Sequence, residues 1–73
     1  MSGYADKLAR LNKKAQFINK WKRRIRKAGM SQEQFCDASG IDRGQLSKWI
    51  NYKIEPEFYN IENVEKELKK LNV

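Results

Sequence analysis

The sequence contains few of the residues that build catalytic and metal centres. Its 73 residues include no histidine, one cysteine and one proline. One cysteine excludes an internal disulfide framework and a cysteine-based zinc site, and the lack of histidine removes the usual general base and the commonest metal ligand. No apolar run approaches the roughly 18 residues of a membrane span, and no signal-peptide segment follows the start. We therefore expect one small soluble domain with no catalytic residue, no metal, no cofactor and no membrane partner.

Positive charge is concentrated in the first thirty residues. Residues 1–30 contain ten Lys and Arg residues and one acid, a net charge of +9, whereas residues 31–73 contain six basic and eight acidic residues, a net charge of −2. Such a field attracts a polyanion, with nucleic acid ahead of an acidic protein or an anionic membrane surface. The plainer interpretation is a charged face that keeps a small protein soluble.

Apolar residues recur at helical spacing at both ends of the chain. In the first part they are Leu8, Leu11, Ala15, Ile18, Trp21 and Ile25, and in the last part Ile61, Val64, Leu68 and Leu71. This spacing predicts a helix from about residue 6 to residue 28 with Gly29 as its C-cap, and a second helix near the C-terminus. It also assigns Phe17 to the core. The spacing leaves open whether residues 1–16 form a separate basic arm or an extension of the first helix.

Two short helices with clear capping signals lie between these segments. Ser31 and Gln34 form a capping-box pattern, and the helix that they begin ends at Gly40, which predicts helix over about 32–39. Asp42 and Gln45 repeat the pattern and predict a helix over about 43–51.

The inward-facing residues of these short helices follow from their spacing. We expect Phe35, Cys36 and Ala38 to face the core from one helix, and Leu46, Trp49 and Ile50 from the next. A loop ending at Pro56 follows. Three aromatic residues in and after this loop are expected to cover the core: Tyr52, Phe58 and Tyr59. The chain is thus predicted to be all-α, with four or five helices.

Several segments together resemble the lambda-repressor/Cro-type (XRE-like) helix-turn-helix family. They are Ala28-Gly29-Met30-Ser31-Gln32, Gly40-Ile41-Asp42, Leu46-Ser47-Lys48-Trp49 and Asn51 before Pro56. Residues 40–49 are also similar to the recognition region of the lambda-type phage CII activator. The resemblance covers residues 17–71. It implies a five-helix domain over residues 17–73, whose third helix lies in the DNA major groove.

The resemblance also implies a function. A protein of this kind is a sequence-specific regulator of transcription that binds a double-stranded DNA operator as a homodimer, and its size suits a phage or a mobile element. It would act in the bacterial cytoplasm or nucleoid, or in the host cell of a phage. The residues leave open whether it is a repressor or an activator, and an activator would also contact RNA polymerase. The dimer surface is also open, with Leu68, Leu71 and Val73 or the Leu8/Leu11 stripe as candidates.

The resemblance assigns two sets of DNA-contacting residues. Base edges would meet Arg43, Gly44, Gln45, Ser47 and Lys48, and phosphates would meet Gln32, Asn51 and Lys53. Helix geometry agrees, because Gly44, Ser47 and Lys48 face outward when Leu46 and Trp49 face inward. Plainer roles remain for Gln45 as a capping residue, Gln32 as an ordinary first-turn residue and Ser47 as a passive groove-lining residue.

The loop after the recognition helix contains Glu55 and Glu57, which would repel DNA. We therefore expect the loop to tilt away from DNA, and the first helix to supply flanking phosphate contacts through Lys20, Arg23 and Lys27. Members of the family often pair an Arg of helix 1 with a Glu of helix 3. Ile25 and Ile50 stand at these places here, which predicts an apolar contact between them; a one-residue shift that puts Arg24 at a core place is the alternative.

Two other functions fit parts of the sequence. One is a protein-interaction module, such as an antitoxin or an anti-repressor, that binds an acidic protein through the basic segment 7–27. The outward face of residues 43–51 favours DNA, because it has no acid and none of the large apolar anchors that a protein-docking face carries. The other, weaker hypothesis is RNA binding through the basic run 20–27.

Overall fold

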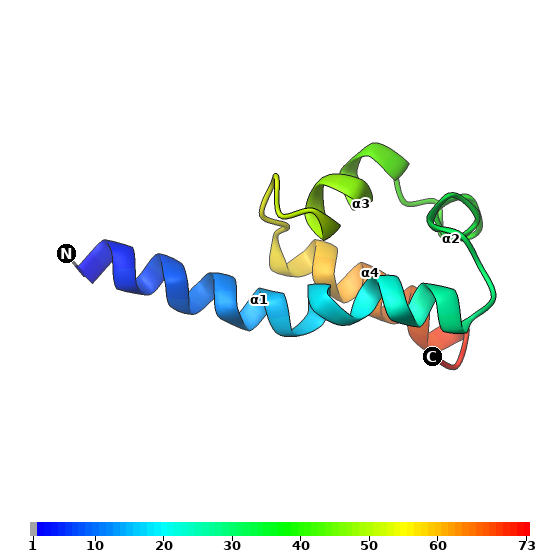
Figure 1. Cartoon of the computed structure of the whole chain (residues 1–73), viewed down its shortest axis with the longest axis horizontal. Coiled ribbons are helices and arrows are strands. Elements are labelled where there is room, and N and C mark those ends of the chain that lie inside the picture. The colour runs from blue at the N-terminus through cyan, green and yellow to red at the C-terminus, as the bar shows by residue number, and fades with distance from the viewer. Residues whose placement is uncertain (1) are drawn as a thin grey trace.

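The computed structural model describes the backbone of residues 2–73 and the side chains of residues 13–73. These residues form four helices: α1 (Ser2–Lys27), α2 (Gln32–Ser39), α3 (Arg43–Ile50) and α4 (Phe58–Lys70). α1 and α4 lie side by side, and α2 and α3 pack across them (Figure 1). The all-α fold is confirmed with four helices over residues 2–73. The fifth helix that the resemblance implies is not among them, because a loop through Pro56 joins α3 to α4 and only turn residues follow α4.

α1 is one continuous helix of 26 residues. It begins before residue 6, the predicted start, and crosses residue 16 without a break, so the basic arm extends the helix; the division into segments 1–16 and 17–73 stays a prediction. Gly29 ends α1 as predicted, in the left-handed conformation with φ 77°. The N–H groups of Gly29 and Met30 donate to the carbonyls of Arg26 and Ile25 at 2.9 and 3.2 Å, which closes the helix as a Schellman motif.

All four helices contribute to one core. Its buried residues are Ile18, Trp21, Ile25, Phe35, Cys36, Ile41, Leu46, Trp49, Ile61, Val64 and Leu68. The predicted helical stripes are therefore confirmed from Ile18 onward, while the side chains of Leu8 and Leu11 lie outside the described residues. Leu68 is fully buried, and the partly buried Leu71 and Val73 pack against the core; the dimer surface stays open.

Ala38 faces solvent, contrary to the prediction. With Phe35 and Cys36 both inward, a step of about 100° per residue turns Ala38 outward and brings Ser39 toward the core. Ser39 is accordingly half-buried, and its hydroxyl accepts a hydrogen bond from the N–H of Ile41 at 3.3 Å.

The expected burial of four aromatic residues is also wrong. Phe17, Tyr52, Phe58 and Tyr59 are 41, 46, 49 and 70% exposed. Phe17 lies about 100° around α1 from Ile18 and so stands beside the buried stripe. Phe58 and Tyr59 begin α4 one turn before Ile61, its first buried residue. The core is therefore complete without these rings.

A charged cluster joins α1 to α4. The indole N–H of Trp21 donates to Glu65 Oε1 at 3.0 Å, and Arg24 Nη1 lies 2.6 Å from Glu65 Oε2. Arg24 Nη2 also donates to the carbonyl of Val73 at 2.8 Å. Arg24 thus pairs with α4 at the edge of the core. The apolar contact between Ile25, which is buried, and Ile50, which is half-buried, stays a prediction.

Candidate nucleic-acid interface

A capping box fixes the start of α2. Gln34 N–H donates to the Ser31 hydroxyl at 3.1 Å, and Ser31 N–H donates to Gln34 Oε1 at 2.9 Å. This confirms the predicted cap. Gln32 is the first helical residue and is half-buried. Its N–H and that of Glu33 belong to the group at a helix start that has no partner within the helix, which suits an anion.

The turn between α2 and α3 depends on a glycine. Gly40 has φ 76° and ψ 11°, and its N–H donates to the Cys36 carbonyl at 2.8 Å. A Cβ atom at Gly40 would meet nothing within 4 Å, so the left-handed backbone, and not a lack of space, requires the glycine. The turn sets the angle between the two helices and therefore the direction in which α3 presents its outer face.

The residues predicted to contact bases are all exposed on α3. Leu46 is fully buried and Trp49 is 7% exposed, while Arg43, Gly44, Gln45, Ser47 and Lys48 face solvent. The rigid attachment through two buried side chains fixes the rotation of α3 about its own axis. The outer face therefore has a fixed set of donors and acceptors to offer.

The N-cap of α3 uses the backbone N–H of Gln45 and not its side chain. Asp42 Oδ2 accepts a hydrogen bond from the backbone N–H of Gln45 at 2.9 Å. The hydrogen bonds found over residues 13–73 do not include the reciprocal bond from Asp42 N–H to the Gln45 side chain, so the amide is left exposed. A Cβ atom at Gly44 would lie 3.1 Å from the capping oxygen, which gives this glycine a local reason as well.

Arg43 forms an ion pair that the sequence analysis does not predict. Its Nη1 atom lies 2.8 Å from Glu33 Oε1, and the two side chains are 60 and 64% exposed. The pair joins the first turn of α3 to the first turn of α2. The two residues belong to different helices, so the pair depends on the turn at Gly40 and cannot be predicted from spacing in the sequence.

The C-terminal end of α3 is closed by Asn51. Its Nδ2 atom donates to the carbonyl of Ser47 at 2.9 Å and to the hydroxyl of Ser47 at 3.3 Å. The carbonyl of Lys48 accepts from the N–H groups of Lys53 and Ile54 at 2.8 and 3.3 Å. Asn51 is thus directed back along the helix, while the side chains of Lys48 and Lys53 remain exposed.

The loop after α3 is attached to α1 at two points. The Tyr52 hydroxyl donates to Asn19 Oδ1, and Tyr52 has a left-handed φ of 58°. Glu55 lies 3.1 Å from Lys14 Nζ, whose side chain is 7% exposed. Glu55, one of the two acids expected to repel DNA, is therefore paired with a buried lysine, and the direction of the loop relative to DNA stays a prediction.

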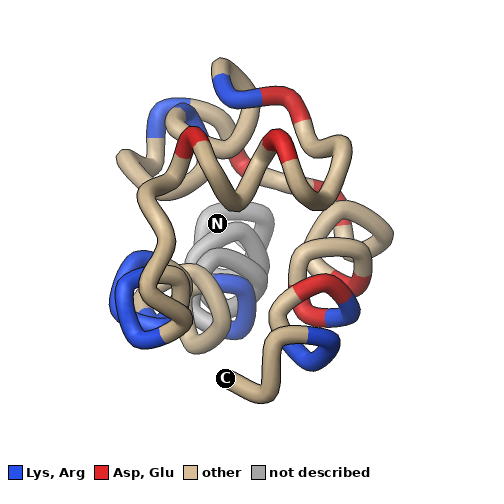
Figure 2. Tube along the Cα trace, turned by 90° about the vertical axis from the view of Figure 1, so that its right-hand side faces the viewer, with Lys and Arg blue, Asp and Glu red and all other residues tan. Residues whose placement is uncertain are grey.

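Lys and Arg residues are concentrated on α1, whereas the charged residues of α2 are all acidic (Figure 2). Lys20, Arg23 and Lys27 are exposed and lie roughly opposite the buried residues Trp21 and Ile25.

Two further basic residues follow the flank of α1 that contacts the loop. Lys22 and Arg26 are exposed and lie three and seven residues after Asn19, which holds Tyr52. Residues at this spacing share one helix face. Lys22 and Arg26 are therefore the basic side chains in line with the C-terminal end of α3. Neither is among the DNA contacts predicted from the sequence, because the contact between the loop and α1 is not visible there.

Burial of Cys36 behind the turn raises the pKa of its thiol, and the neighbouring carboxylates Asp37 and Asp42 add to this against the opposing effect of Arg43. The thiol is thus a core group. Over residues 13–73 no group of three or more Cys, Asp and Glu side chains is arranged to hold a metal ion.

Comparison with known protein families matches residues 20–71, more than half of the chain, to a helix-turn-helix family. The chain belongs to this family. It is the Cro/CI type of helix-turn-helix, and the match makes the protein a DNA-binding regulator of transcription. Neither the curated proteins nor the solved structures contain a match to the chain. None of the described helices is long and apolar enough to cross a membrane.

Proposed function

We propose that this helix-turn-helix protein binds a specific double-stranded DNA operator by placing α3 in the major groove. The observation that carries the proposal is the outer face of α3. Gly44, Ser47 and Lys48 on this face are exposed and small, polar or basic, and Leu46 and Trp49 hold the opposite face in the core. A polar, acid-free face on a fixed helix suits base edges, whereas a protein-docking face would carry aromatic or aliphatic anchors.

The chemistry of each side chain suggests its role. Arg43 and Lys48 can donate to guanine O6 and N7, and the amide of Gln45 can pair with adenine N6 and N7. Ser47 can donate to a base because its hydroxyl already accepts from Asn51 and keeps its own proton free. Gly44 allows the backbone of α3 to approach the groove closely.

Phosphate contacts would surround α3. Gln32 at the α2 N-terminus and Lys53 after α3 would hold the two sides, with Asn51 as a cap that also lies near the backbone of DNA. From α1 we propose Lys20, Arg23 and Lys27, joined by Lys22 and Arg26 on the flank in line with Tyr52. Such contacts fix orientation and carry no sequence information.

The protein would act as a homodimer on two half-sites about one helical turn apart. A small domain of this type suits a phage or mobile-element regulator, and the local similarity of residues 40–49 to the CII activator agrees with that origin. Occupation of an operator near a promoter would repress transcription; contact with RNA polymerase from the same position would activate it.

Substitution separates base contacts from phosphate contacts. Arg43→Ala or Lys48→Ala should cost about 1–3 kcal/mol on the selected site and relax its specificity, whereas Lys27→Ala should weaken binding to all sequences alike. Fluorescence anisotropy with selected and random duplexes measures both effects. Equal losses on the two duplexes for all three variants would contradict these roles.

A further inference from the structure

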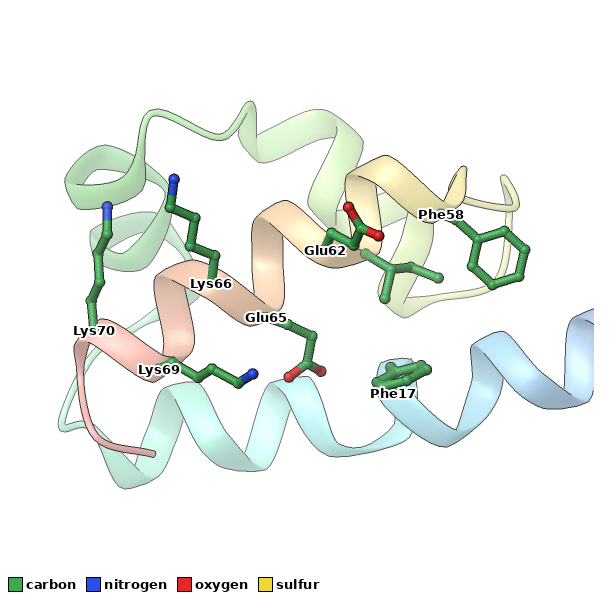
Figure 3. A pocket seen from close by; sticks show the side chains of 8 residues that line it. Phe17, Phe58, Glu62, Glu65, Lys66, Lys69 and Lys70 are labelled. Carbon is green, nitrogen blue, oxygen red and sulfur yellow. The ribbon is translucent and has the colours of Figure 1, made fainter.

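A groove between α1 and α4 lies apart from the DNA-binding helices. It has a volume of about 730 Å³ and is lined by one residue of α1, Phe17, and by seven of α4: Phe58, Ile61, Glu62, Glu65, Lys66, Lys69 and Lys70. No residue of α2 or α3 lines it, so DNA bound to α3 would leave it open. Figure 3 shows Phe17 facing α4, with Phe58 toward one end and Lys69 toward the other.

Both aromatic rings in this groove are exposed, and a buried lysine lies against one of them. Phe17 and Phe58 are 41 and 49% exposed, and Ile61 between them is buried at 3%. Lys14 Nζ lies 4.8 Å from the centre of the Phe58 ring, while Glu55 fixes this lysine at 3.1 Å. Preorganised aromatic side chains beside an aliphatic floor are typical anchors of a protein interface.

The length of the groove favours an extended partner. Its lining residues run from Phe58 to Lys70, the first and last residues of α4. At a rise of 1.5 Å per residue this is about 18 Å, or three helical turns. An amphipathic helix that lies along such a groove presents apolar residues at positions i, i+3, i+4 and i+7.

The charges at the rim favour an acidic partner. Glu65 is neutralised by Arg24 at 2.6 Å, and Lys70 is paired with Glu67 at 3.2 Å. Lys66 and Lys69 take part in no ion pair found over residues 13–73. Against these two cations of the lining stands one unpaired acid, Glu62.

The same charges disfavour a second copy of this chain. Its net charge is +7, and residues 1–30 alone have a net charge of +9. A cationic helix would meet a cationic rim. We propose that the α1–α4 groove is a docking site for an acidic amphipathic helix of another protein, which binds through apolar residues placed against Phe17 and Phe58.

Titration of the full chain with a synthetic peptide tests this proposal. The probe has leucine at helical positions i, i+3, i+4 and i+7 and glutamate at the exposed positions, and the control peptide has lysine in place of glutamate. Nuclear magnetic resonance spectra of the ¹⁵N-labelled chain report which residues respond. We expect the acidic peptide to shift signals of residues around Phe17, Phe58 and Ile61, and the lysine peptide to leave them unchanged.

Matched variants locate the site. Phe17→Ala and Phe58→Ala should each weaken peptide binding about tenfold, as loss of an interface anchor does, while Tyr59→Ala, which removes an exposed ring of α4 outside the groove, should not. Lys66→Glu with Lys69→Glu should weaken binding of the acidic peptide. These side chains are half-exposed or exposed, and circular dichroism confirms folding.

Three results would overturn the proposal. They are peptide binding that Phe17→Ala and Phe58→Ala leave unchanged, displacement of the peptide by single-stranded oligonucleotide, and concentration-dependent self-association that buries the groove. Each variant is also measured on duplex DNA. Retained DNA binding with lost peptide binding supports the docking site, and loss of DNA binding in Lys48→Ala alone concerns only the function of α3.

Discussion

Replacement of Glu33 by glutamine should strengthen DNA binding. Glu33 Oε1 holds Arg43 Nη1 at 2.8 Å, and a guanidinium that reads a base must leave this carboxylate. Both side chains are more than half exposed, and ion pairs of this kind contribute about 0.2–1 kcal/mol. Glu33→Gln removes that cost and should raise the affinity for the selected site by about 1.4- to 5-fold at 25 °C. The gain should diminish at high salt, which screens exposed charges.

The control for this substitution is Asp37→Asn. Asp37 is an exposed acid of the same helix that forms no ion pair with Arg43, so Asp37→Asn removes the same charge without breaking that pair. Anisotropy titrations of labelled duplex should give a larger gain in affinity for Glu33→Gln than for Asp37→Asn. The difference should vanish when each substitution is combined with Arg43→Ala. A loss of affinity in Glu33→Gln would mean that the carboxylate orients Arg43 for reading, and would refute this reasoning.

Three further predictions concern stability, measured by urea unfolding. Glu65→Ala should destabilise by about 3 kcal/mol, because it leaves the buried indole N–H of Trp21 and the guanidinium of Arg24 without the Glu65 carboxylate. Glu65→Gln should cost less because the amide oxygen still accepts from Trp21, and equal losses would contradict the role of the Trp21 hydrogen bond. Gly40→Ala should cost about 1–2 kcal/mol through its left-handed φ of 76°, and an unchanged midpoint would show that the turn relaxes. The raised pKa of the Cys36 thiol favours its protonated form in the folded state. Its contribution to stability is therefore present below the ordinary thiol pKa of 9.0 and is lost as the pH rises above it. The free energy of unfolding of Cys36→Ala should decline less steeply than that of the parent chain between neutral pH and pH values above 9.0.

Local signals predicted most of the fold. The capping box of α2, the N-cap of α3, the two glycines and the helical stripes each depend on residues within about four positions of one another, and the structure confirms α2 over Gln32–Ser39 and α3 over Arg43–Ile50. The predicted start of α1 near residue 6 is wrong by several residues, since the helix begins at Ser2.

The errors come from contacts between distant parts of the chain. Helical spacing places Phe17 with the apolar stripe of α1 but cannot show that α4 leaves it at the rim of a groove. In the same way, the pair between Glu33 and Arg43 and the bond between Tyr52 and Asn19 exist only after the turn and the loop have placed these residues together. Apart from the half-buried Gln32, the predicted DNA-contacting residues are exposed, and their contacts with DNA stay predictions.

Selection of binders from a randomised duplex library at about 150 mM salt tests the central proposal, recognition of a DNA sequence by α3. The account predicts a recurring motif, with half-sites about one helical turn apart if the protein binds as a dimer, and a relaxed motif for Lys48→Ala. Salt-sensitive binding to every sequence, with no motif recovered, would contradict it and leave the basic surface of α1 as the only nucleic-acid-binding element.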